Sequence, residues 1–159
     1  MTTESGEDYV WPGGAGPDHS IVCYSAICAH RMTYPAKAVS FLNYRHSKVV
    51  YFDENQNRQE KEKIIYCCSE RSVYDAQNGG KVLGGPAPQP IATILLEYDE
   101  NENCFYALGA LGGTLFEKLL NEFEFRLQLD FRIANVREST VNQVNLFTLE
   151  EYSEVVVHC

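Results

Sequence analysis

Apolar and polar residues alternate along several stretches of the chain, which is the pattern of half-buried β-strands. Combined with the many β-branched and aromatic residues, this alternation predicts strands at 20–26, 39–44, 48–53, 64–66, 91–98, 104–108 and 125–133. The alternation is strictest in 125–133, where every second residue is Phe, Leu or Ile. Short strands are also expected on both sides of Gly79-Gly80, at 73–74 and 81–83, because paired glycines favour a hairpin turn.

Turn and loop signals separate these strands. The short segment 45–47 is expected to join the strands 39–44 and 48–53. Residues 53–63 contain no apolar side chain, which predicts a solvated hairpin tip or a flexible loop. The run Gly-Gly-Pro-Ala-Pro at 84–88 predicts a loop, because proline cannot donate to a sheet and glycine permits unusual dihedral angles.

Helical spacing occurs once, in residues 114–123. Leu115, Leu119 and Phe123 recur every four residues, so they share one face of a helix. Thr114 followed by Glu117 matches a capping box and predicts the start of the helix at Thr114.

Many short strands and one short helix predict an all-β fold, a sandwich or small barrel of antiparallel sheets. Residues 1–18 are rich in Gly, Pro and acids and predict an irregular arm. Trp11 is expected to dock onto some surface, and an arm that carries it would suit a subunit that clings to a partner. Residues 19–133 are expected to form the domain, and 134–159 an extended tail.

The 159-residue chain carries 22 acidic and 13 basic residues and a formal charge of −9. Binding to nucleic acid depends on Lys and Arg that neutralise phosphates, so this balance argues against a nucleic-acid partner. No apolar run approaches the ~20 residues of a membrane span, and the first residues lack the pattern of a secretory signal. A cytoplasmic location is therefore the default expectation.

The candidate chemistry lies in two cysteine-containing loops. In the first, Cys28 and His30 flank a single residue, and in the second, Cys67 and Cys68 are adjacent. A thiolate and an imidazole that point at one centre suit iron or zinc. A thiol-redox or zinc site at Cys67-Cys68 is an alternative, although the pair lacks the Cys-x-x-Cys spacing of such sites.

The order of these motifs resembles the Rieske iron–sulfur proteins. Cys-x-His at 28–30 is followed by a cysteine loop that closes in Ser72-Val73-Tyr74-Asp75, and then by Gly-x-Val-x-x-Gly-Pro-Ala-Pro at 80–88. The resemblance runs from residue 20 to about residue 108, over half of the chain. It implies stacked antiparallel sheets with two loops at one end that hold a [2Fe–2S] cluster, and a Pro-rich third loop that includes Pro86 and covers it.

In a Rieske centre two thiolates hold one iron and two imidazoles hold the other. By resemblance, Cys28 binds the first iron and His30 the second, and the second loop supplies one more thiolate from Cys67 or Cys68. Ser72 and Tyr74 occupy the positions whose hydroxyls donate to a bridging sulfide and to a cysteine sulfur.

The second loop departs from the family pattern because it contains no histidine. If Cys67 is the ligand, Glu70 stands where the imidazole belongs, and if Cys68 is the ligand, Arg71 does. Ligation by both Cys67 and Cys68, ligation by His46, and loss of the cluster are further alternatives. Position 33 is Thr, so the additional cysteine of the Rieske subunit in cytochrome bc complexes is also missing.

The resemblance implies a one-electron transfer protein, or a small electron-transfer subunit of an oxidoreductase, that transforms no substrate itself. Its expected partner is a redox protein, a cytochrome or a larger oxidoreductase subunit, docked over His30. The alternative is a Rieske-like structural or binding subunit that has lost or altered its cluster.

Overall fold

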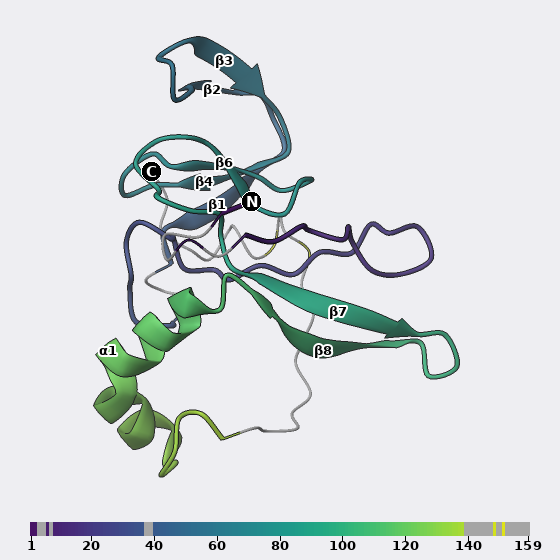
Figure 1. The fold of residues 1–159 in the computed structure, drawn as a ribbon, viewed down its shortest axis with the longest axis vertical. Coiled ribbons are helices and arrows are strands. Elements are labelled where there is room, and N and C mark those ends of the chain that lie inside the picture. Colours follow the sequence, from purple (N-terminus) through teal and green to yellow (C-terminus); the bar gives the residue numbers. More distant parts are fainter. Residues whose placement is uncertain (3–5, 7, 37–39, 139–147, 149–150, 152–159) are drawn as a thin grey trace.

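The computed structural model of the chain is built mainly from antiparallel β-strands (Figure 1). It describes residues 1–159 except 3–5, 7, 37–39, 139–147, 149–150 and 152–159. The described elements are β1 (Leu42–Arg45), β2 (Val49–Phe52), β3 (Arg58–Lys61), β4 (Ile64–Cys67), β5 (Val73–Asp75), β6 (Lys81–Gly84), β7 (Thr93–Asp99), β8 (Cys104–Leu111) and α1 (Thr114–Phe131). Antiparallel sheets with a single helix confirm the predicted fold class.

A four-stranded antiparallel sheet in the order β1-β4-β5-β6 forms the centre of the molecule. Both glycines of the Gly79-Gly80 turn between β5 and β6 have positive φ, which confirms the predicted hairpin. Residues of this sheet and of two loops beside it form the buried core, namely Cys28, Leu42, Ile65, Cys67, Tyr74, Ala76 and Ile91. The candidate cysteines Cys28 and Cys67 therefore lie in the hydrophobic core.

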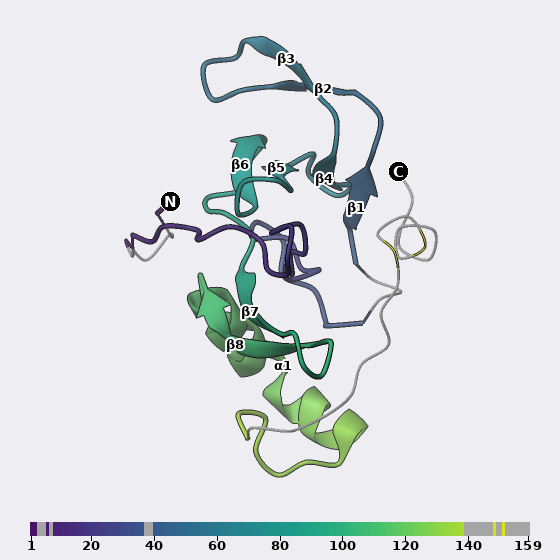
Figure 2. The same cartoon turned by 90° about the vertical axis from the view of Figure 1, so that its right-hand side faces the viewer.

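The hairpin β2-β3 stands at one end of the molecule, and α1 lies at the opposite end, with the four-stranded sheet between them (Figures 1 and 2). The predicted pairing of 39–44 with 48–53 is wrong, because β1 pairs with β4 and β2 pairs with β3. The prediction of 53–63 as a loop is also wrong in part, since β3 lies within it. Strand pairing uses backbone groups, so the wholly polar β3 forms without an apolar face and stays mostly exposed.

The hairpin β7-β8 forms the third sheet and confirms the predicted hairpin at 91–108. The predicted strand 20–26 is wrong, because this segment forms only isolated bridges, one of them between Tyr24 and Thr93. The Ser25 N–H donates to the Ala92 carbonyl, and the Ile94 N–H donates to the Cys23 carbonyl. These few bonds hold the segment along β7 without a continuous ladder, and they lead the chain to Cys28.

The helix α1 is longer than predicted and includes most of the segment 125–133, whose prediction as a strand is wrong. Tertiary packing decides the outcome, because Leu115, Leu119 and Leu127 are buried along one side of the helix. Phe123 also packs edge-on against Tyr34, with ring centroids 5.5 Å apart. The predicted capping box is absent, since Gly113 is the N-cap and no side chain caps the helix.

The N-terminal arm packs onto the β5-β6 turn. Gly79 has a φ of +60°, and a Cβ at this position would lie 2.8 Å from Trp11 Cγ, so the turn accommodates the indole only because it is glycine. Most of the tail predicted at 134–159 lies outside the described residues. Within the described part of the chain, α1 lacks the length of apolar sequence needed to cross a membrane.

Candidate metal centre

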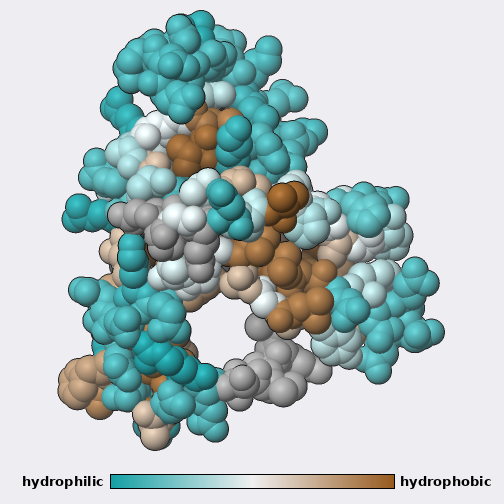
Figure 3. All heavy atoms as spheres, in the orientation of Figure 1, coloured by the Kyte–Doolittle hydropathy of each residue, from teal (hydrophilic) through white to brown (hydrophobic). Residues whose placement is uncertain are grey.

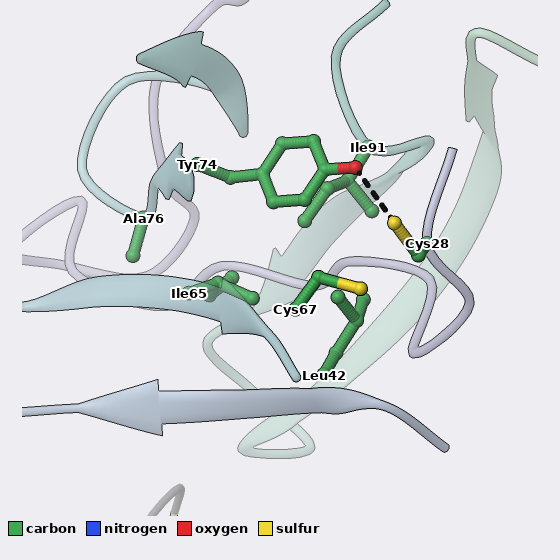
Figure 4. Packing of buried hydrophobic residues seen from close by; sticks show 7 residues of the cluster. All are labelled: Cys28, Leu42, Ile65, Cys67, Tyr74, Ala76 and Ile91. Atoms are coloured by element: carbon green, nitrogen blue, oxygen red, sulfur yellow. Dashed lines mark hydrogen bonds between the residues drawn. The ribbon is translucent and has the colours of Figure 1, made fainter. Parts of the chain in front are cut away.

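Two cysteines from different loops meet beside a tyrosine in the core (Figure 4). Cys28 lies in the loop that follows residues 20–26, Cys67 is the last residue of β4, and Tyr74 is the middle residue of β5. Cys28 is 4% exposed and Cys67 is fully buried. The Tyr74 hydroxyl lies 3.1 Å from Cys28 Sγ. The structure therefore brings together Cys28, Cys67 and Tyr74 as the sequence predicts.

Backbone N–H groups surround both sulfurs in a similar way. The N–H groups of His30 and Arg31 hydrogen-bond to the Cys28 sulfur, and those of Ser69 and Glu70 hydrogen-bond to the Cys67 sulfur. In both loops the donors lie two and three residues after the cysteine. Such donors stabilise negative charge on sulfur, which a metal-bound thiolate also requires.

The two sulfurs shift each other's pKa in opposite directions. The Cys67 thiol beside Cys28 lowers the pKa of Cys28 to about 5, against the opposite effect of burial, and the Tyr74 hydroxyl lowers it further. The neighbouring Cys28 sulfur and burial raise the pKa of Cys67. Burial and Cys28 raise the pKa of Tyr74, whose hydroxyl is hydrogen-bonded to the Cys28 sulfur. Ionising both sulfurs requires added positive charge between them, which a metal provides.

The second loop is a closed turn. The Arg71 N–H donates to the Cys67 carbonyl at 2.9 Å, and the Cys67 N–H donates to the Ser72 carbonyl at 2.8 Å. Arg71 has a φ of +61°, a conformation that is uncommon for a residue with a side chain. The turn therefore has a defined shape that places the Ser69 and Glu70 amides on the Cys67 sulfur.

Ser72 carries a buried hydroxyl that has no hydrogen-bond partner among the described residues. Its side chain is fully buried, and a buried hydroxyl without a partner costs about 1–3 kcal/mol. An acceptor supplied by a bound group removes this cost. Ser72 is therefore a buried donor that lacks an acceptor in the described part of the chain.

The Pro-rich third loop lies directly against the second. Gly85 has a φ of +87°, and a Cβ there would lie 2.6 Å from the Arg71 carbonyl oxygen and 2.6 Å from Ser72 Cα. Pro86, the candidate cover of the cluster, follows Gly85 and is exposed. The contact through Gly85 holds the third loop on the backbone of the second.

Cys68, the other candidate thiolate of the second loop, is disulfide-bonded and is therefore not a free thiolate ligand. It and Arg71 face a different part of the molecule. Asn43 Nδ2 donates to Cys68 Sγ at 3.1 Å. Both residues line an open groove of about 1490 Å³ between the β2-β3 hairpin and the four-stranded sheet, whereas Cys67 and Glu70 do not line it. The pattern of the sequence gives no sign of this groove, since its walls come from segments far apart in the chain.

His30 is exposed at the surface next to the buried Cys28. Within the described ranges, no group of three or more His, Cys, Asp or Glu side chains is already assembled as a metal site. The residues fit the thiolate half of a [2Fe–2S] cluster, because two sulfurs, the Tyr74 hydroxyl and four N–H groups converge there. At the two positions where the Rieske pattern has imidazoles, this chain has His30 in the first loop and Glu70 or Arg71 in the second.

No protein-family model matches the chain. The solved structure of the soluble domain of the Rieske protein II (SoxF) from Sulfolobus acidocaldarius is similar to it, with 24% sequence identity and a TM-score of 0.45. The similarity covers 69% of this chain and 54% of that chain, so this chain spans about half of the length of that domain. The cluster and the activity proposed below therefore rest on the residues of the site itself.

Proposed function

We propose that this chain is a one-electron carrier whose cofactor is a [2Fe–2S] cluster held between loops 28–31 and 67–72. The observation that supports this most strongly is the meeting of two buried cysteine sulfurs with the Tyr74 hydroxyl. The buried and unpartnered Ser72 hydroxyl lies two residues before Tyr74 in the chain. A cysteine that only fills space in the core is neutral and requires no hydrogen-bond donors around its sulfur. Hydroxyl and amide donors stabilise both sulfurs if both carry negative charge.

The bound cluster would supply a reversible one-electron couple. Cys28 and Cys67 would hold one iron, and Tyr74 and Ser72 would donate hydrogen bonds to sulfur. Donors to sulfur stabilise the more negative, reduced state, so these two hydroxyls would raise the reduction potential. The burial of both cysteines keeps water away from this iron and its sulfur ligands.

Electron exchange would take place at the exposed side of the site. Cys28 and Cys67 are buried, whereas His30 is exposed, so His30 is the ligand that a docked partner can contact. The partner would be a redox protein, a cytochrome or a larger oxidoreductase subunit. The chain's own residues carry out no bond-making step on a substrate in this function.

A structural or binding subunit without a cluster is the second candidate. It is favoured by the second loop, which presents Glu70 and Arg71 in place of a histidine. In that case Cys28 and Cys67 serve as small residues of the core, a common role for cysteine.

The two functions differ in what the purified protein contains. We expect anaerobically purified, iron-replete protein to be reddish brown, to contain two irons and two sulfides per chain, and to give an EPR signal after reduction.

Cys28→Ser and Cys67→Ser should lose the colour and the iron while circular dichroism shows an unchanged fold. Cys104→Ser is the matched control, because Cys104 lies on β8 outside the core cluster and should keep the full cluster content. Colourless, iron-free but folded wild-type protein would favour the second candidate.

A further inference from the structure

Cys68 in the second loop is disulfide-bonded, and the other cysteines of the chain indicate its partner. The chain has six cysteines. Four of the other five are free thiols, namely Cys23, Cys28, Cys67 and Cys104. The remaining one is Cys159, which lies outside the described residues. Within one chain, Cys159 is therefore the partner that Cys68 can have.

The groove that Cys68 lines presents apolar side chains on both of its walls. It has a volume of about 1490 Å³ and lies between the β2-β3 hairpin and the four-stranded sheet. Val50 and Phe52 on β2 line it and are 48% and 57% exposed. Val82 and Leu83 on β6 line the other wall and are partly exposed. Apolar atoms are visible directly below the hydrophilic hairpin in the space-filling view (Figure 3). A second apolar segment that covered these side chains would remove their surface from water.

The residues that precede Cys159 in the sequence are apolar. Residues 155–157 are three consecutive valines, which favour an extended chain because they are branched at Cβ. In an extended chain Val155, Val157 and Cys159 would share one face, since side chains alternate between the two faces. A disulfide from Cys159 to Cys68 would therefore bring two valines to the groove.

Charges along the groove match the sequence before these valines. Residues 150–154 include three glutamates. The basic residues Arg71 and Lys81 on the sheet side line the groove and are exposed, whereas Asp53 and Glu54 line it on the hairpin side. Opposite charges attract, so we expect the glutamates on the sheet side of the groove.

The chain between the described residues and Cys159 is long enough to reach this groove. Arg137 is held at α1 by an ion pair with Glu117 at 3.2 Å, and α1 lies at the opposite end of the molecule from the β2-β3 hairpin (Figures 1 and 2). An extended chain of about 20 residues spans up to about 65 Å, which is about twice the diameter of a small domain. Residues 138–159 can therefore extend from α1 to Cys68.

We propose that residues 155–159 bind in the groove beside β2 and that Cys159 forms a disulfide with Cys68. An external disulfide such as oxidised glutathione accepts the two electrons: the two cysteine thiols lose their protons and join, and the reagent becomes two thiols. The bound segment would cover Val50 and Phe52 and would fix the chain beside Cys67, the neighbour of Cys68. This inference goes beyond the proposed function, because neither the bond nor the groove needs a cluster.

Peptide mapping tests the pairing on the full chain, purified without reductant and with its free thiols blocked by N-ethylmaleimide in denaturant. Trypsin cleaves after Lys63, Arg71 and Arg137, so we expect peptide 64–71 to be linked to peptide 138–159. Fragmentation of the linked peptide should place the bond on Cys68, with N-ethylmaleimide on Cys67. A bond between the Cys68 residues of two copies, a bond from Cys67, or a blocked Cys68 would overturn the pairing.

Glutathione redox buffers test the binding of the segment in the groove, because they measure the effective concentration of Cys159 at Cys68. Phe52→Ala removes apolar surface from the groove and should lower this effective concentration by about threefold or more. Phe125→Ala is the matched control, since Phe125 is 74% exposed on α1 and should leave the value unchanged. Equal values for Phe52→Ala and wild type would overturn binding in the groove, and circular dichroism checks that both variants are folded.

Discussion

At the scale of single residues, the buried hydroxyls of Tyr74 and Ser72 differ in their partners. Tyr74 is already hydrogen-bonded to the Cys28 sulfur, whereas Ser72 has no partner among the described residues. Tyr74 is therefore satisfied in the protein without cofactor. Ser72 is unsatisfied until an acceptor arrives, which makes it a sensitive test of the site.

Replacing Ser72 by Ala should change the cluster more than the fold. We expect Ser72→Ala to keep its iron and to have a lower reduction potential than wild type, because one donor to sulfur is removed. Protein-film voltammetry or a redox titration followed by EPR measures the shift. Ser69→Ala is the control, since Ser69 is exposed and contributes its backbone N–H to Cys67. An unchanged potential in Ser72→Ala would show that this hydroxyl does not donate to the cluster.

A second residue-scale prediction concerns Tyr24 and alkaline pH. Burial and the nearby Asp75 carboxylate raise the pKa of Tyr24 to about 12, and its hydroxyl donates to the Ala76 carbonyl at 3.0 Å. In the unfolded chain the pKa of tyrosine is about 10, so the unfolded state loses this proton first as the pH rises. The stability from Tyr24 is therefore complete below about pH 10 and is lost between about pH 10 and 12.

Tyr24→Phe tests this linkage. The variant should lose about 1 kcal/mol in the free energy of unfolding at pH 7, the value of one hydrogen bond. Its stability should also decrease less steeply than that of wild type above pH 10. Urea unfolding at several pH values measures both effects. Equal slopes for the two proteins would contradict the assigned role of Tyr24.

At the scale of secondary-structure elements, α1 shows how an alternating sequence becomes a helix. Alternating positions lie on one face of a strand but on different sides of a helix. In α1, Leu127 is 7% exposed, whereas Phe125 is 74% exposed and Leu129 and Phe131 are also exposed. Hydrophobic atoms are visible at the end of α1 in the space-filling view, whereas the β2-β3 hairpin is covered by hydrophilic ones (Figure 3).

A helix and a strand in the segment that holds Phe125 and Leu127 predict different effects of mutating these two residues. In the helix, Leu127→Ala should cost about 2–4 kcal/mol in the free energy of unfolding, because Leu127 is buried. Phe125→Ala should change it by less than about 0.5 kcal/mol, because the ring is mostly in solvent. Denaturant unfolding measures both variants. Similar losses in the two variants would indicate a strand with both side chains on one face.

At the scale of the whole molecule, three separate antiparallel sheets are joined through the central one. The Lys61 ammonium on β3 forms a 2.7 Å ion pair with the buried Asp75 carboxylate on β5, which connects the β2-β3 hairpin to the central sheet. The N-terminal arm joins the same sheet through Trp11 and the Gly79 turn. Elements far apart in sequence thus stabilise the strands that position the cysteine loops.

Trp11 is the only tryptophan, so its fluorescence reports on the arm. Because the indole packs on the β5-β6 turn, its emission should shift to longer wavelength at the same urea concentration at which circular dichroism shows unfolding. Gly79→Ala, which places a methyl group against the indole, should shift the emission before the global transition. An early shift in wild type would indicate an arm that detaches independently.

Local sequence determined the parts of this protein that depend on near neighbours. Gly79-Gly80 specifies a hairpin because glycine accepts positive φ, and the apolar alternation of 91–98 and 104–108 specifies the β7-β8 pair. The two cysteine loops and the third loop at 84–88 are also evident from local residue types. For these features, the residue types at the turns and the alternation of apolar side chains predict the same structure that tertiary packing produces.

Only the tertiary structure decided features that depend on distant contacts. It made a helix of 125–131, since burying Leu127 on the packed side of α1 outweighs the strand-like alternation. It paired β1 with β4 and not with β2, because strand partners are chosen by packing across the core. It also placed Cys67 beside Cys28 and turned Cys68 toward the groove. Which of these two adjacent residues faces Cys28 depends on the direction of β4 relative to the first loop.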